Sequence, residues 1–177
     1  MFNLHIYRYP FLVFIIIAGF LWHSLDLSAK ELPHSLIGKK FPTFNLPNLI
    51  AHEPELQNEI FKGKISVVHV WASWCGACRK DQKFLTALKK SDDYQLVGID
   101  YKDSRHEAEN WLNKLGDPYT VNIYDHHGRL GVDLGLYGTP TTYIVDQDGV
   151  IRFRHVGTLT KEYWNNKILA EIKKLKA

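Results

Sequence analysis

Hydrophobic and polar positions divide the chain into an apolar N-terminal stretch and a longer region of short, regular patterns. The stretch from Phe11 to Trp22 has twelve residues without a polar side chain, and Arg8 precedes it. Counted outward over residues 6–27, the apolar character reaches about 20 residues, which is enough for a membrane-spanning helix. Because a basic residue favours the cytoplasmic side, the pattern predicts a transmembrane anchor within residues 1–27 that sends the rest of the chain out of the cytoplasm.

A cleaved signal peptide is the alternative for this stretch. Twelve apolar residues also match the length of a signal-peptide core, and cleavage after Ala29 is conceivable. Leu27 would then stand where cleavage prefers a small residue, so the pattern favours an uncleaved anchor. Residues 28–37 have mixed charge, a proline and no periodicity. They predict a linker before a folded domain over residues 38–177.

Within the folded domain the pattern predicts alternating strands and helices. Residues 65–71 are β-branched and aromatic, which predicts a strand buried on both faces. Apolar positions at helical spacing predict an amphipathic helix from residue 79 to about 89. The other predicted elements are an edge strand near 41–46, strands at 95–100, 121–124, 141–145 and 150–155, helices at 105–115 and after 160, and one helical turn at 133–137. This βαβα order followed by a hairpin and a helix implies an α/β fold, with helices flanking a mixed central sheet.

Composition narrows the class of protein. Hydrophobic residues at 45% and charged residues at 23% are typical of a globular chain of 177 residues. Lys and Arg total 22 and Asp and Glu total 19, so the net charge of +3 is too small to argue for binding nucleic acid. With only two cysteines, a domain of this size does not depend on disulfide bonds for its fold.

The two cysteines, Cys75 and Cys78, form one C-x-x-C motif between the predicted strand at 65–71 and the helix that follows. This turn places the first sulfur over a helix N-terminus, where free N–H groups and the helix dipole stabilise an anion. The sequence therefore predicts a lowered pKa for Cys75, which acts as the nucleophile. Cys78 is then the thiol that resolves the mixed disulfide.

Three other uses of the motif are weaker. A structural zinc site needs four ligands, and the chain has no second C-x-x-C. Haem attachment needs a histidine directly after the second cysteine, where Arg79 stands. A purely structural disulfide across so short a loop removes little entropy from the unfolded chain. We therefore expect redox chemistry with no metal site and no cofactor.

The motif and a later turn together resemble the thioredoxin superfamily. The similarity rests on W-C-G-A-C after a buried strand and on residues 138–141, Gly-Thr-Pro-Thr, before a later strand. It implies a thioredoxin-like fold in which Pro140 is cis and its loop lies against the C-x-x-C. The backbone of Thr139 would then pair with a substrate peptide beside Cys75. Trp74, Thr139 and Pro140 are the expected substrate-binding residues.

Five short sequence segments, taken in their order along the chain, resemble the DsbE/CcmG family more closely. They are L-I-G-K at 36–39, V-W-A-S-W-C at 70–75, Y-K-D at 101–103, G-L-Y-G-T-P at 135–140 and I-R-F-R-H at 151–155. Members of that family are thiol:disulfide interchange proteins of cytochrome c maturation, held in the bacterial inner membrane and facing the periplasm. The resemblance implies a reductase for the haem-attachment cysteines of apocytochrome c, or for a thiol protein of the haem-ligation machinery. A membrane disulfide reductase would supply its electrons, and residues 6–27 would hold it in the inner membrane.

Two residues behind the cysteines are candidate proton relays. His69 occupies the strand position where thioredoxin has a buried aspartate, and it could accept the Cys78 proton. A neutral, hydrogen-bonded core histidine is the commoner use of such a residue. Asp100, on the neighbouring predicted strand, is a weaker candidate of the same kind.

Two departures from the family pattern bear on the redox properties. Gly76 stands where the family commonly has proline, and Thr141 stands where it usually has glutamate after the cis-proline. A nearby carboxylate disfavours a thiolate, so its loss is expected to lower the pKa of Cys75 relative to that in relatives.

Two other functions stay open: a general periplasmic thiol reductase, and a Cu(I)-binding assembly factor for a respiratory oxidase. The chain has only one methionine, so it offers few soft ligands for Cu(I), which weakens the interpretation as a copper-binding protein.

Overall fold

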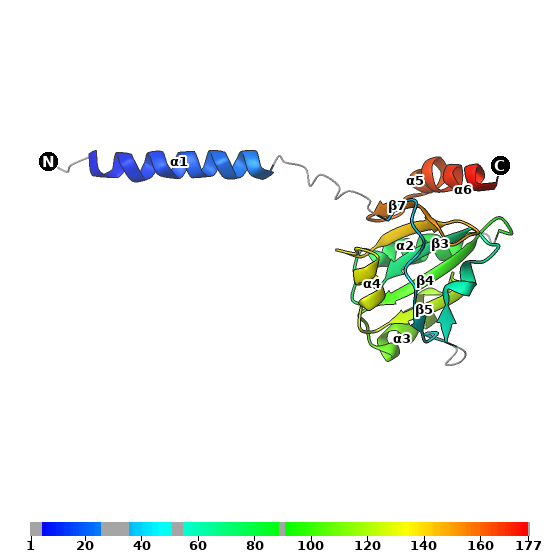
Figure 1. The fold of residues 1–177 in the computed structure, drawn as a ribbon. Coiled ribbons are helices and arrows are strands. Elements are labelled where there is room, and N and C mark those ends of the chain that lie inside the picture. Colours follow the sequence, from blue (N-terminus) through cyan, green and yellow to red (C-terminus); the bar gives the residue numbers. More distant parts are fainter. Residues whose placement is uncertain (1–4, 26–35, 51–54, 89–90, 177) are drawn as a thin grey trace. The chain divides into compact units, whose positions relative to one another are not determined.

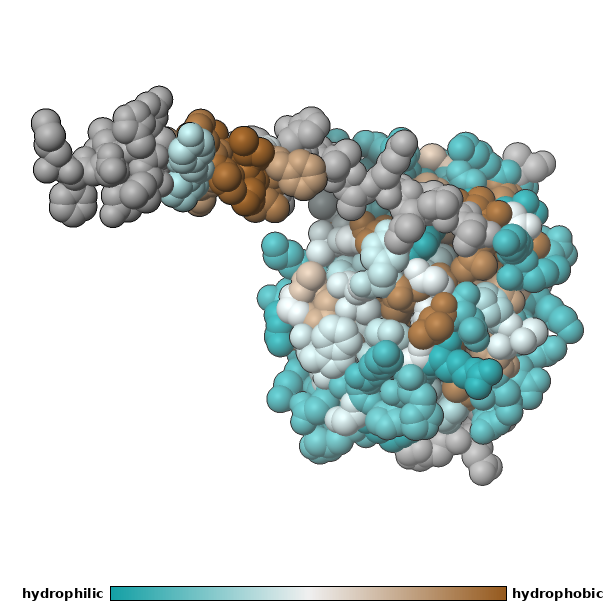
Figure 2. Space-filling view, turned by 60° about the vertical axis from the view of Figure 1, so that its left-hand side comes forward, coloured by the Kyte–Doolittle hydropathy of each residue, from teal (hydrophilic) through white to brown (hydrophobic). Residues whose placement is uncertain are grey.

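The computed structural model describes residues 5–25, 36–50, 55–88 and 91–176. The chain divides into two compact units, residues 1–34 and 35–177. In the first unit, α1 (His5–Leu25) is a helix whose described side chains, residues 9–21, are exposed and mostly apolar (Figure 2). Within the described residues, no helix is both long enough and apolar enough to span a bilayer. Most of the predicted linker lies outside the described residues.

A five-stranded mixed sheet forms the centre of the second unit (Figure 1). Its strand order is β5–β4–β3–β6–β7, in which β3, β4 and β5 are parallel and β6 and β7 are antiparallel to their neighbours. The strands are β3 (Ser66–Trp71), β4 (Gln95–Tyr101), β5 (Val121–Asp125), β6 (Thr141–Val145) and β7 (Ile151–Val156). This arrangement confirms the predicted α/β fold with a mixed central sheet.

Helices cover both faces of the sheet (Figure 1). They are α2 (Cys78–Ala87), α3 (Arg105–Leu115), α4 (Arg129–Asp133) and a C-terminal run made of α5 (Lys161–Tyr163), the π-helix η2 (Trp164–Ile168) and α6 (Leu169–Lys176). Buried side chains of α2, α3, η2 and α6 belong to one core, and those of α4 belong to the core on the other face. The 3₁₀-helix η1 (Asn58–Phe61) adds Phe61 to that second core.

Two of the predicted elements differ from those observed. The edge strand predicted near 41–46 is reduced to β1 (Asn45–Leu46), which pairs with β2 (Leu56–Gln57). The helical turn predicted at 133–137 is instead α4, four residues earlier. The Asp125 carboxylate explains this shift, because it accepts the N–H groups of Leu130 and Gly131 and so satisfies free donors at the start of α4.

Strand β3 positions the chemistry of the molecule. All six of its residues are buried, as predicted for a strand covered on both faces. Side chains alternate along a strand, and Val67 and Trp71 belong to the core beneath α2 and α3 while Val68 and Val70 belong to the opposite core. His69 therefore faces the same layer as Trp71, directly behind the helix that carries the cysteines.

Candidate active site

The C-x-x-C motif lies where β3 leads into α2, as predicted. Cys75 and Cys78 are joined by a disulfide bond, and Cys78 is the first residue of α2. The backbone N–H of Cys78 donates to Cys75 Sγ at 3.1 Å, and no side chain of the described residues caps this end of the helix. A free helix N-terminus that already donates to the first sulfur is suited to stabilise a thiolate there once the pair is reduced.

Both cysteines have little exposed surface, and Cys78 has less than Cys75. Cys75 is 5% exposed and Cys78 is 1% exposed in this oxidised form. Cys75, the predicted nucleophile, is thus slightly the more exposed of two nearly buried residues. Their chain neighbours Trp74, Gly76 and Ala77 are exposed.

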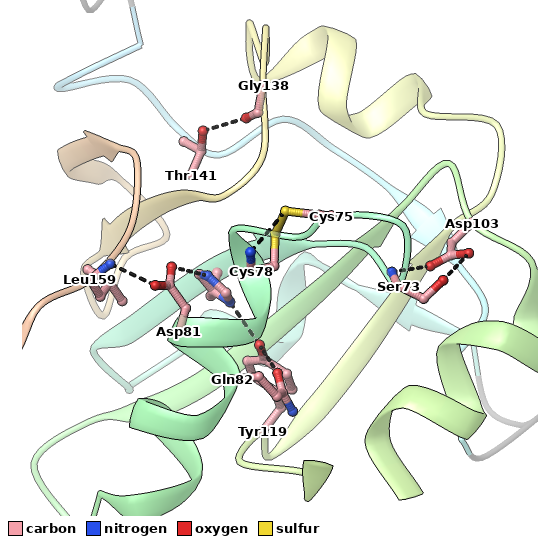
Figure 3. Close-up of a disulfide and its surroundings, with 11 residues drawn as sticks. Ser73, Cys75, Cys78, Asp81, Gln82, Asp103, Tyr119, Gly138, Thr141 and Leu159 are labelled. Atoms are coloured by element: carbon pink, nitrogen blue, oxygen red, sulfur yellow. Dashed lines mark hydrogen bonds and ion pairs between the residues drawn. A yellow bond between two sulfur atoms is a disulfide. The ribbon is translucent and has the colours of Figure 1, made fainter. Parts of the chain in front are cut away.

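The Pro140 loop adjoins the cysteines. The Thr139–Pro140 peptide bond is cis, which confirms the prediction. Thr141 pairs with Val70 near the end of β3, so the loop lies at the edge of the sheet from which the motif emerges (Figure 3). Thr141, at the position of the expected family glutamate, is buried, and its hydroxyl donates to the Gly138 carbonyl at 2.8 Å. Thr139, the residue before Pro140, is half-buried.

The segment that carries Trp74 is held by the turn after β4. The Trp74 indole is 58% exposed, and its Nε1–H donates to the Lys102 carbonyl at 3.0 Å. Ser73 donates both its backbone N–H and its hydroxyl to the Asp103 carboxylate (Figure 3). Lys102 has a φ of 50°, an uncommon conformation for a non-glycine residue that is often found at functional sites. These bonds present an exposed aromatic surface beside Cys75.

His69 lies behind the cysteines, fully buried and paired with an acid. Its Nε2 lies 3.3 Å from Asp81 Oδ2, and its Nδ1 lies 2.8 Å from the Tyr119 hydroxyl. Asp81 Oδ1 accepts the backbone N–H of Leu159 at 2.9 Å. Asp81 comes one helical turn after Cys78, so the two side chains share a face of α2. Sequence reasoning missed Asp81, although an acid between Cys78 and the buried Leu85 on one helix face was a signal.

The hydrogen bonds assign the protons of this buried group. The Gln82 amide donates to the Gly116 carbonyl, so its Oε1 is free to accept from the Tyr119 hydroxyl at 3.2 Å. The Tyr119 oxygen then accepts from His69 Nδ1–H. Burial raises the pKa of Tyr119 well above its ordinary value, so the phenol keeps its proton. The remaining ring nitrogen, His69 Nε2, faces the carboxylate of Asp81.

Asp100 is buried too, but it belongs to a different group. Among the described residues, no N–H or O–H donor reaches either of its carboxylate oxygens. Burial, and after it the nearby charge of Asp103, raise the pKa of Asp100 to about 9. Asp100 therefore lies on the side of Asp103, whereas His69 is paired with Asp81 on α2.

In the part of the chain that the structure describes, no three His, Cys, Asp or Glu side chains gather where they could hold a metal ion. The arrangement is suited to thiol–disulfide exchange: two cysteines at a helix N-terminus, a cis-proline loop beside them and a buried acid–histidine pair behind them.

Comparison with known proteins agrees with that chemistry. The Redoxin family matches residues 36–172. A Pseudomonas aeruginosa protein is 42% identical over 159 residues, which cover 90% of this chain and 88% of the relative. A protein of Escherichia coli strain K12 is 38% identical over 165 residues, which cover 90% of this chain and 89% of the relative. Both relatives are named thiol:disulfide interchange protein DsbE.

Solved structures give the same fold. A crystal structure from Chlorobium tepidum, assigned as a DsbE thiol:disulfide interchange protein, superposes with a TM-score of 0.65 at 26% identity, covering 77% of this chain and 97% of that one. A secreted thiol-disulfide isomerase from Corynebacterium glutamicum superposes with a TM-score of 0.63 at 20% identity, covering 75% of this chain and 85% of that one. The second likeness concerns the thioredoxin-like fold alone.

Proposed function

The chain belongs to the Redoxin family and, within it, to the DsbE thiol:disulfide interchange proteins, and from this premise we propose that it is a membrane-tethered periplasmic reductase of cytochrome c maturation. Its activity is that of a thiol-disulfide oxidoreductase. One observation carries the proposal: a helix N-terminus donates a backbone N–H to Cys75, on the side of the sheet where the loop with cis Pro140 begins β6.

The proposed exchange begins with the reduced protein. The Cys75 thiolate attacks one sulfur of the substrate disulfide, a Cys75–substrate disulfide forms, and the other substrate sulfur leaves as a thiolate that takes up a proton. Cys78 then loses its proton and attacks Cys75 Sγ, which releases the second substrate thiolate. Two electrons pass to the substrate, and the protein is left with the Cys75–Cys78 disulfide that the structure contains.

The buried group suits the second step. Cys78 attacks as a thiolate, so its proton needs an acceptor in a site closed to water. The site between His69 Nε2 and Asp81 Oδ2 accepts one proton without leaving an isolated charge, since Tyr119 and Leu159 hold the other atoms of the pair. His69 thus serves as a proton relay through Asp81, and Asp100 has no place in this route.

The N-terminal sequence supports the proposed location. The apolar stretch at residues 11–22 and the basic Arg8 before it suit a helix inserted in the inner membrane with the domain outside the cytoplasm. In an oxidising compartment the pair needs renewed reduction, which a membrane disulfide reductase would supply. For such a two-electron couple, about 30 mV corresponds to about 1.4 kcal/mol, so modest differences in reduction potential set the direction of transfer.

Substrate trapping tests the proposal. In the full-length Cys78→Ala protein, Cys75 is expected to stay joined to its substrate because no thiol resolves the mixed disulfide. Mass spectrometry of trapped adducts from the periplasm should identify an apocytochrome c or a thiol protein of haem ligation, and Cys75→Ala should trap neither. Adducts dominated by unrelated periplasmic proteins would indicate a general reductase. Tight Cu(I) binding without any adduct would indicate the assembly factor.

A further inference from the structure

Two adjacent residues of the turn after β4 hold two adjacent residues of the active-site segment. Asp103 accepts the backbone N–H of Ser73 on Oδ2 and the Ser73 hydroxyl on Oδ1, the latter at 2.9 Å (Figure 3). The Lys102 carbonyl accepts the indole N–H of Trp74 at 3.0 Å. We call these three bonds the turn clamp. Its partners are 30 and 28 residues apart in the sequence, so the clamp ties the active-site segment to a separate part of the fold.

The turn that supplies these acceptors is itself held from the side of β5. Lys102 has a φ of 50°, and its backbone N–H donates to the Asp125 carbonyl at 3.1 Å. The Asp103 carbonyl accepts the Tyr124 hydroxyl at 3.2 Å and lies 2.8 Å from His126 Nδ1. A non-glycine residue keeps such a backbone conformation only where its surroundings determine it. The turn is therefore a fixed support for the bonds of the clamp.

Cys75 is held by other bonds. Its backbone N–H donates to the Ala72 carbonyl at 3.2 Å, and its Sγ accepts the backbone N–H of Cys78 at 3.1 Å. None of the three bonds that define the turn clamp involves Cys75. The helix N-terminus thus acts on the sulfur, whereas the clamp acts on the segment that carries the Trp74 indole.

The Trp74 indole has the properties of a contact surface for a substrate chain. It is 58% exposed, so packing within the domain covers less than half of it, and its N–H bond to the turn fixes one edge of the ring. A large aromatic surface that is already held in place loses little conformational freedom when a partner binds to it. A small disulfide has no chain that could use this surface.

We propose that the turn clamp, with Asp103 as its positioning residue, holds the Trp74 indole as a platform for the peptide chain that flanks a substrate disulfide. The clamp thereby favours disulfides carried by a polypeptide over small free disulfides. The inference deepens the proposed function, on whose thiol–disulfide exchange it rests, and it does not depend on which protein carries the substrate disulfide.

The test compares two substrates in single turnovers of the pre-reduced full-length protein: a disulfide-bonded peptide and hydroxyethyl disulfide. Ser73→Ala removes the hydroxyl bond of the clamp and keeps the backbone bond to Asp103. It is expected to slow reduction of the peptide by about tenfold, because the platform is no longer held in place. Reduction of hydroxyethyl disulfide should change by less than about twofold, since Cys75 keeps its own bonds. Ser73→Thr keeps a hydroxyl and should restore the peptide rate.

Double variants show whether the clamp acts through Trp74. Asp103→Ala removes both acceptors of Ser73 and should slow the peptide at least as much as Ser73→Ala. Trp74→Ala should give a similar loss with the peptide alone. When Ser73→Ala is added to Trp74→Ala, the peptide rate should fall by less than about twofold more, because the two changes remove one and the same effect.

Ser104→Ala is the matched control for folding. The Ser104 hydroxyl caps α3 by accepting the Glu107 N–H at 3.3 Å, and it forms no bond of the clamp. The control should unfold at a lower urea concentration than the wild type, because a helix cap is lost. Both of its rates should stay within about twofold of the wild-type rates.

Three results would overturn the proposal. They are equal slowing of both substrates in Ser73→Ala, a peptide rate that Ser73→Thr does not restore, and a further large loss when Ser73→Ala is added to Trp74→Ala. The proposed function fails separately, because trapping of unrelated proteins by Cys78→Ala would contradict the role in cytochrome c maturation. That outcome would leave the expected ratio of the two rates unchanged, since both rates are measured with chosen disulfides.

Discussion

Replacing Cys75 by serine is expected to lower the rate of disulfide reduction by on the order of a thousandfold or more, because no other thiol can start the exchange. Cys78 is 1% exposed and begins α2, so it cannot meet a substrate disulfide in place of Cys75. The measurement is reduction of a disulfide-bonded peptide by the pre-reduced full-length protein under single-turnover conditions.

Cys78→Ser is the matched variant for this prediction. It should still consume one peptide per protein at a rate near that of the wild type, because attack by Cys75 precedes any step of Cys78. It should then stop at the mixed disulfide. Equal loss in both variants, or fast reaction of Cys75→Ser, would show that the two cysteines have been assigned the wrong roles.

Asp81→Ala is expected to lower the free energy of unfolding by about 3–5 kcal/mol. The Leu159 N–H loses its acceptor, and His69 Nε2 loses its partner, in an interior closed to water. The variant should also release substrate more slowly, since the proton of Cys78 loses its acceptor. Urea unfolding of the oxidised protein measures the first effect, and decay of the mixed disulfide after attack by Cys75 measures the second.

Two controls separate these effects. Asp92→Ala removes an exposed carboxylate and should change the free energy of unfolding by less than about 0.5 kcal/mol. Asp81→Asn keeps an oxygen for the Leu159 N–H, so it should recover part of the stability but little of the release rate. If Asp81→Ala unfolds at the same urea concentration as Asp92→Ala, the buried pair has no structural importance. If release stays fast in both Asp81 variants, Asp81 is not the route of the proton.

Local features of the sequence were enough to predict the scaffold of the site. The β-branched and aromatic run at 65–71 predicted a doubly buried strand, and the two cysteines at its end predicted the turn into a helix. The cis bond before Pro140 followed from family resemblance together with the motif. For the strand and the turn the signal lies within a few adjacent residues, so it needs no knowledge of the tertiary fold.

Contacts between residues far apart in the chain could not be predicted from the sequence. Asp81 meets the Leu159 N–H across 78 residues, and Ser73 meets Asp103 across 30. No periodicity in the sequence links such pairs, because only the folded domain brings them together. His69 was recognised as a candidate, yet its partners Asp81 and Tyr119 were not. The position of α4 was missed for a local reason, since one buried carboxylate, that of Asp125, decides where it begins.

The central claim is that the start of α2 holds Cys75 as a thiolate, and the pH dependence of its alkylation tests this most directly. In the reduced full-length protein, with the modified cysteine identified by mass spectrometry, alkylation of Cys75 is expected to reach half of its maximal rate well below about pH 8.5, the pKa of an ordinary thiol. Cys78 should react far more slowly throughout. A midpoint at or above that pH, or preferential alkylation of Cys78, would contradict the account.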